Sequence, residues 1–147
     1  MTDKQHRIQA LICSVMNYLR AQKGCMPGVD ITLDKLAAMN LSDKSQIDIR
    51  SKSTRHDEVL GNAIAGIVAT ELVEIASCLK AAKDDLVWRE DNAQFYKQGA
   101  DLGEGYTKCN LHTLLIGPDA CGYYHPDFSL GIFMLGPRTL YRDHNHK

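Results

Sequence analysis

Several protein classes are excluded by what the sequence lacks. Its 17 lysines and arginines are balanced by 18 acidic residues, and no basic block could neutralise a run of phosphates, so nucleic acid is not an expected partner. The five cysteines are scattered, and no Cys-x-x-Cys pair could begin a zinc ribbon. The N-terminal stretch MTDKQHRIQA has no apolar core of a signal peptide. We therefore expect reduced thiols in a cytoplasmic protein.

A long uncharged apolar run is also missing. The most apolar window, residues 63–79, contains Glu71 and Glu74, and carboxylates near the centre of a bilayer are costly. This window predicts a soluble helix and no membrane partner. With 147 residues and 44% hydrophobic side chains, the chain can bury one core but not two independent ones.

The N-terminal part predicts helices. Thr2 followed by Gln5 is a capping box, and the apolar residues that follow recur at spacings of three and four. Gly24 and Pro27 predict the end of this helix. A short helix is expected over Thr32–Met39. The apolar residues of the first helix are Ile8, Leu11, Ile12, Val15, Tyr18 and Leu19.

The longest helix is expected to begin at Thr54, with Asp57 in the capping-box position. Gly61 and Gly66 are interpreted as points of close packing within it and not as a break. We therefore assign residues 1–83 to an N-terminal helical segment.

The pattern changes after Trp88, where short apolar runs alternate with Gly-Pro and Pro-Asp turns. In the run from Phe128 to Leu135, apolar side chains alternate with a period of two, which predicts a strand with both faces largely buried. Residues 84–147 are thus expected to form a β-domain of barrel or sandwich type, and the fold class is α+β. Of the adjacent Tyr123 and Tyr124, only one can face inward.

The residues with most chemical meaning lie in the C-terminal stretch YRDHNHK. On an extended strand His144 and His146 project to the same side, so two imidazoles could bind one divalent transition metal such as zinc, iron, nickel or manganese. Tyr141 would lie on the opposite face unless a bulge intervenes. A solvated polar tail is the alternative. His112 and His125 are interpreted as structural or surface histidines, a position facing the pocket being the alternative for each. Trp88 and Phe95–Tyr96 are interpreted as the seal between helices and sheet, an aromatic wall for a sulfonium cation being the alternative.

The run HPDFSLGIFMLGPRTLYRDHNHK resembles the stretch leading into the first cupin motif of the cupin-type dimethylsulfoniopropionate lyases. In that family an apolar strand, a Gly-Pro turn, a tyrosine and His-x-His follow in this order, and a helical segment precedes the barrel. The resemblance implies cleavage of dimethylsulfoniopropionate, a small-molecule substrate, to dimethyl sulfide and acrylate by removal of the proton next to the carboxylate. It implies His144 and His146 as metal ligands and Tyr141 as a pocket tyrosine.

The chain departs from the family pattern after the two histidines. The family continues with a glutamate ligand, a second tyrosine and a later histidine, so we expect a cupin barrel truncated at its C-terminus and inactive as this chain. Exposed strand edges predict a homo-oligomer. The alternatives are a cupin sensor or another cupin enzyme, and a non-enzymatic helical interaction module. Product analysis and light scattering discriminate between them.

Overall fold

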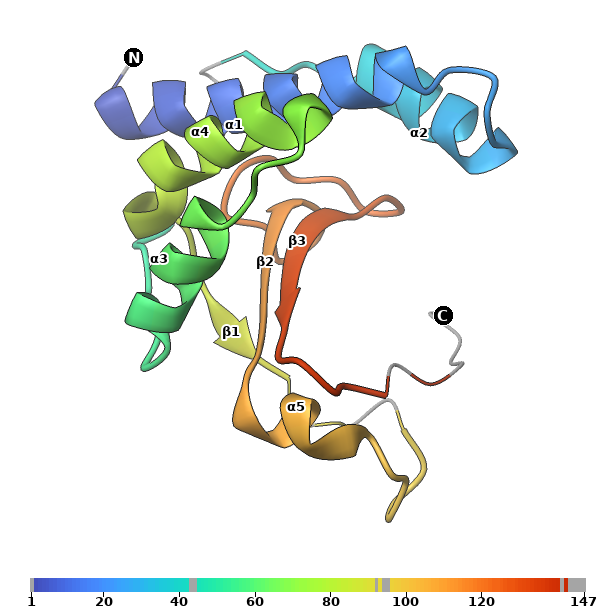
Figure 1. Ribbon diagram of the computed structural model, residues 1–147. Helices are drawn as coiled ribbons and strands as arrows, with labels where there is room; N and C mark the ends of the chain where they lie inside the picture. Colours follow the sequence, from blue (N-terminus) through green and yellow to red (C-terminus); the bar gives the residue numbers. More distant parts are fainter. Residues whose placement is uncertain (1, 43–44, 92, 94–95, 141, 143–147) are drawn as a thin grey trace.

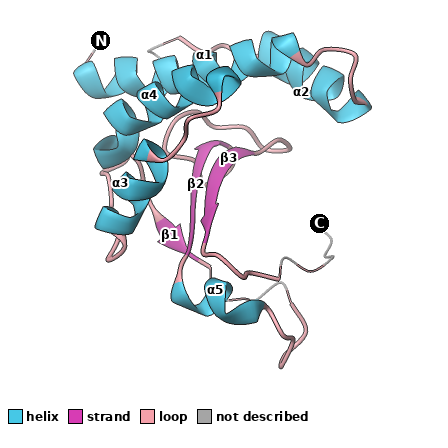
Figure 2. Ribbon diagram, viewed as in Figure 1, coloured by secondary structure: helices cyan, strands magenta, loops and turns pink. Residues whose placement is uncertain are grey.

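The computed structural model describes residues 2–42, 45–91, 93, 96–140 and 142. Helices cover one side of a small antiparallel sheet, and a short helix lies at the sheet's far end (Figure 1). The division into helix and strand is seen in Figure 2. In chain order the elements are α1 (Asp3–Ala21), α2 (Pro27–Ala38), α3 (Asp57–Ala65), the 3-10 turn η2 (Thr70–Leu72), α4 (Val73–Ala82), the 3-10 turn η3 (Lys83–Asp85), β1 (Arg89–Glu90), α5 (Gly103–Lys108), β2 (Asn110–Ile116) and β3 (Leu130–Leu135).

The start and end of α1 confirm the sequence prediction. The amide of Gln5 donates to Thr2 Oγ1 (3.3 Å) and the amide of Thr2 donates to Gln5 Oε1 (2.9 Å), which is the predicted capping box. Gly24 has a positive φ of 81° after the helix ends. Pro27 opens α2 several residues before the expected Thr32, because proline lacks only an amide that the first helical turn leaves unpaired anyway.

The expected long helix from Thr54 is wrong. The chain instead forms α3 and α4, separated at residues 66–72, and Gly66 caps α3 by donating its amide to Asn62 O (3.0 Å). A Cβ on Gly61 would meet nothing within 4 Å, so this glycine marks no close packing. Apolar residues spaced by three and four fit two short helices as well as one long helix. Leu60 is buried on α3 and Leu79 is buried on α4.

The sheet is antiparallel, in the order β1-β2-β3. Leu111 lies opposite Met134, and Thr113 lies opposite Ile132. Leu111, Ile132 and Met134 belong to one core with residues of α1, α3 and α4, and Thr113 is buried as well. The α+β class and the strand after Phe128 are confirmed. Because successive side chains of a strand point to opposite faces, the residues between these positions lie on the other face of the sheet.

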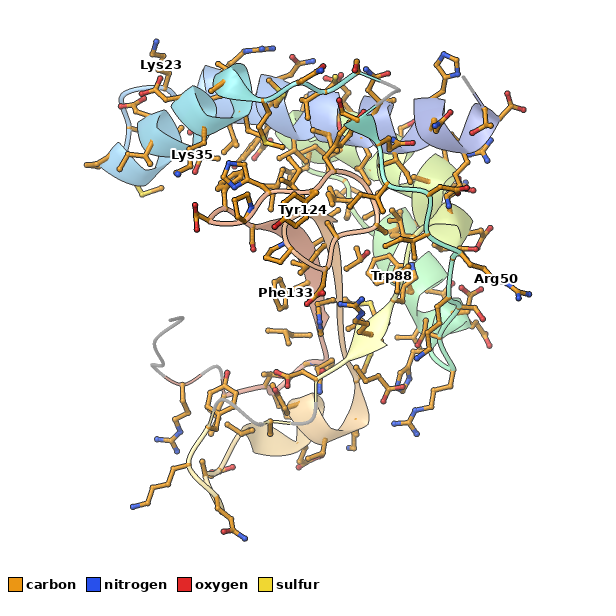
Figure 3. The ribbon with its side chains drawn as sticks, turned by 180° about the vertical axis from the view of Figure 1, so that it is seen from behind. Lys23, Lys35, Arg50, Trp88, Tyr124 and Phe133 are labelled. Atoms are coloured by element: carbon orange, nitrogen blue, oxygen red, sulfur yellow. The ribbon has the colours of Figure 1, made fainter. Side chains whose placement is uncertain are left out.

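The expectation that both faces of β3 are buried is wrong, because the face that points away from the helices is partly exposed. Phe133 is 55% exposed and Leu135 is 37% exposed. Phe133 projects away from the helices, whereas Trp88 projects toward them (Figure 3). Trp88 is buried and donates its indole N–H to Lys83 O (2.9 Å), so its predicted sealing role is confirmed.

The structure tests two other expectations for the C-terminal half of the chain. Tyr123 is buried and Tyr124 is 62% exposed, as predicted for adjacent residues of extended chain. Tyr106, expected at the start of a strand, lies in α5 instead. Among the described residues, none of the helices combines the length and apolar character that a bilayer crossing needs.

Candidate functional site

The predicted chemical residues Tyr141, His144 and His146 lie outside the residues that the structure describes. The two described residues on either side of Tyr141 are held by specific bonds. Leu140 donates its amide to Leu102 O (2.8 Å), and Arg142 Nε donates to Asp101 O (3.0 Å). These bonds fix the approach to the predicted motif against the segment that opens α5.

Glycines allow the close approach of this segment to α5. A Cβ on Gly103, whose φ is +75°, would lie 2.1 Å from Arg138 O. A Cβ on Gly105 would lie 2.2 Å from Pro137 O and 2.6 Å from Gly136 O. Backbone touches backbone here, which larger residues would prevent. The turn after β3 therefore packs on α5 with no side chain between them.

The face of the sheet that points away from the helices carries a row of three side chains, one from each strand. Arg89 of β1 is registered with His112 of β2, and His112 with Phe133 of β3. Residues directly opposite each other in an antiparallel pair share a face, with Cβ atoms about 5 Å apart. A cation, an imidazole and an aromatic ring thus lie side by side on the open face.

His112 is the central residue of this row and is poorly solvated. Its ring stacks on Phe133, with centroids 5.6 Å apart and an interplanar angle of 22°. Its Nδ1 atom is buried and has no hydrogen-bond partner among the described residues. Burial lowers the pKa of His112, Asp91 raises it and Arg89 lowers it further. The imidazole is therefore held in its neutral form near neutral pH.

A cavity of about 510 Å³ is lined by residues from the end of β1, the loop that follows it, α5 and the first residue of β2. The Tyr106 hydroxyl donates to Asp91 Oδ2, and the Asp91 amide donates to Asn110 Oδ1 (2.6 Å). Asn110 Nδ2 donates in turn to the carbonyls of Asp91 (3.1 Å) and Tyr106 (3.0 Å). These bonds fix the wall of the cavity. Its lining is Glu90, Asp91, Ala93, Ala100, Asp101, Leu102, Gly103, Tyr106, Thr107 and Asn110.

A second polar group lies at the edge strand. Arg55 donates to both carboxylate oxygens of Glu90 (3.0 and 2.9 Å), which lowers the pKa of Glu90. His56 Nε2 is buried, 3.8 Å from Glu90 Oε2, and makes no hydrogen bond with the described residues. This group ties the start of α3 to β1.

The remaining candidate residues from the sequence analysis make contacts that stabilise the fold. His125 Nδ1 accepts the Asp127 amide (3.1 Å) at a turn, as expected for a structural histidine. Tyr96 packs edge-on against Tyr106 (5.7 Å, 87°), and its neighbour Phe95 lies outside the described residues. His112 lies mid-strand as expected, but its place in the open row was not predicted.

Sequence reasoning missed Arg89 and the Asp91–Tyr106 pair. Arg89 belongs to a strand of only two residues, too short to show a periodic pattern, and Tyr106 meets Asp91 across a loop. No signal in the sequence could have found them. Within the described part of the chain, no group of three or more His, Cys, Asp or Glu side chains could hold a metal, and the five cysteines are free.

Comparison with known proteins gives one family. The model of the dimethylsulfoniopropionate lyase family matches residues 31–147, which is most of the chain and includes the sheet, the cavity and the predicted motif. No curated protein and no solved structure matches.

Proposed function

The chain belongs to the dimethylsulfoniopropionate lyase family, and on this basis we propose that the protein is a metal-dependent lyase of cupin type that cleaves dimethylsulfoniopropionate to dimethyl sulfide and acrylate. The family match is the observation that carries this proposal. In this elimination a base accepts the proton next to the carboxylate, the electrons of that carbon–hydrogen bond form the carbon–carbon double bond, and dimethyl sulfide leaves with the electron pair of the carbon–sulfur bond.

The catalytic residues are proposed to be those of the C-terminal motif. His144 and His146 would bind a divalent transition metal, which would stabilise the negative charge that develops next to the substrate carboxylate. Tyr141 would contact the substrate in the same pocket. Two imidazoles are only half of a four-coordinate shell, so we further propose that residues 1–147 by themselves release little dimethyl sulfide.

Several described residues hold the segment that leads to the proposed site. Arg142 and Leu140 are fixed to residues 101 and 102, which also line the cavity between β1, β2 and α5. The exposed side chains of Phe133 and Leu135 give this face an apolar surface, from which a bound substrate would displace water. A sheet with helices on one face and an open apolar face on the other is consistent with part of a cupin barrel.

Gas chromatography of dimethyl sulfide tests the proposal on the protein as its gene encodes it. We expect release that disappears after chelation and returns with a divalent transition metal. His144→Ala or His146→Ala should lower activity about 100-fold or more, because the ligand is lost. His6→Ala, at an exposed position on α1, is the matched control and should change nothing. Absence of dimethyl sulfide from the metal-loaded protein would contradict the proposal.

We also propose that the protein self-associates. Both β1 and β3 are edges of the three-stranded sheet, and unpaired edge groups favour pairing with another chain. Light scattering should give a mass above that of one chain, and a stable monomer over a wide concentration range would contradict this.

A further inference from the structure

The row on the open face offers groups that are complementary to the two charges of a zwitterionic sulfonium acid. Arg89 offers a guanidinium with two parallel donors for a carboxylate, and Phe133 offers the face of an aromatic ring, which attracts a cation. Both groups are available: Arg89 has no carboxylate partner among the described residues, and Phe133 is 55% exposed. We propose that Arg89, His112 and Phe133 form the substrate-binding strip, an inference that rests on the proposed function.

The spacing of the row suits such a ligand. Arg89 and Phe133 are two strands apart, about 10 Å between their backbones. A propionate chain between them, with its carboxylate on the guanidinium and its sulfonium against the ring, spans the position of His112. The strip therefore fixes the direction of the substrate, because the reverse orientation would place a sulfonium cation beside the guanidinium of Arg89.

His112 shapes the strip between its two ends. A neutral imidazole stacked on Phe133 holds that ring in place and adds no positive charge beside the sulfonium. Its register opposite Arg89 places the two side chains next to each other on the same face of β1 and β2. His112 is thus a positioning residue, and the two ligand contacts are made by its neighbours in the row.

Substrate analogues that each lack one charge separate the two contacts. The ligands are dimethylsulfoniopropionate, its carboxamide, which keeps only the sulfonium cation, and the thioether 3-(methylthio)propionate, which keeps only the carboxylate anion, with binding to the 147-residue chain measured by isothermal titration calorimetry. Arg89→Gln should weaken binding of dimethylsulfoniopropionate about tenfold or more and leave the carboxamide unaffected. Phe133→Leu should weaken binding about 3- to 30-fold and leave the thioether unaffected.

Arg50→Gln is the matched charge control, since Arg50 is exposed on the other side of the molecule from Phe133 (Figure 3). Circular dichroism establishes that each variant is folded. His112→Gln should weaken binding of dimethylsulfoniopropionate and of the carboxamide, because it removes the imidazole that holds the ring of Phe133 in place against their sulfonium group.

The outcome separates this inference from the proposed function. Charge-selective loss in Arg89→Gln and Phe133→Leu supports the strip, even if the protein releases no dimethyl sulfide. Release of dimethyl sulfide at an unchanged KM in both variants would overturn the strip and leave the lyase assignment intact. Concentration-dependent dimerisation that Phe133→Leu abolishes, with no change in ligand binding, would also overturn it, since the face would then be covered by a second copy.

Discussion

Gly105→Ala tests whether the approach to the C-terminal motif depends on backbone contact with α5. The new Cβ would lie 2.2 Å from Pro137 O and 2.6 Å from Gly136 O, so the turn must move by about 1 Å to reach normal van der Waals separation. The movement strains the bond from the Gly136 amide to Cys109 O (2.8 Å). We expect the turn after β3 to separate from α5.

The size of the effect follows from two losses and one gain in stability. Overpacking costs about 1–3 kcal/mol, and each weakened backbone hydrogen bond costs about 1 kcal/mol. Alanine restores about 0.5–1 kcal/mol, because it is a better helix former than glycine. Gly105→Ala should therefore lower the free energy of unfolding by about 1–3 kcal/mol, and it should also lower activity, since residues 141–147 follow the displaced turn.

Urea unfolding monitored by tryptophan fluorescence measures the stability, because Trp88 is the only tryptophan and is buried. Gly61→Ala is the matched control: its Cβ would meet nothing within 4 Å, and it should be neutral or stabilising by up to about 1 kcal/mol. Equal urea midpoints for Gly105→Ala and the wild type would refute the close contact between α5 and residues 136–137.

Three further predictions concern the core, one histidine and the thiols. Leu115→Ala removes a side chain with no exposed surface and should lower the free energy of unfolding by about 2–5 kcal/mol in urea titrations, whereas an unchanged midpoint would place Leu115 outside the core. Because the folded-state pKa of His112 lies below its ordinary value of 6.5, its stabilising contribution is present above that pH and declines as the pH falls, so thermal melts below pH 6.5 should show a loss that His112→Gln reduces. Iodoacetamide followed by mass spectrometry should modify the exposed Cys13 and Cys25 well before Cys109, whose burial raises the pKa of its thiol; equal rates would contradict that burial.

Local chemistry made part of the fold predictable from the sequence. Thr2 and Gln5 satisfy the first helical amides whatever the rest of the chain does, so the start of α1 was predicted correctly. The alternation through β3 likewise predicted a strand, because period two has no helical counterpart. The failure at Gly66 has a physical cause: apolar spacing reports which side chains are buried and not whether the helix axis is continuous.

The site could be predicted less completely, because its residues meet only in three dimensions. Tyr141, His144 and His146 were found by their spacing within a few residues, and their roles stay predictions. The row of Arg89, His112 and Phe133 depends on the register of three strands, which the sequence does not give. The exposure of Phe133 was not predicted either, since both faces of an apolar strand look alike in sequence.

The most direct test of the lyase assignment is the isotopic composition of the acrylate formed from dimethylsulfoniopropionate that carries two deuterium atoms next to the carboxylate. For the metal-loaded protein as its gene encodes it, we predict equal amounts of dimethyl sulfide and acrylate, with one deuterium retained in the acrylate. Formation of 3-hydroxypropionate in place of acrylate, or no carbon–sulfur cleavage at all, would contradict elimination by proton removal.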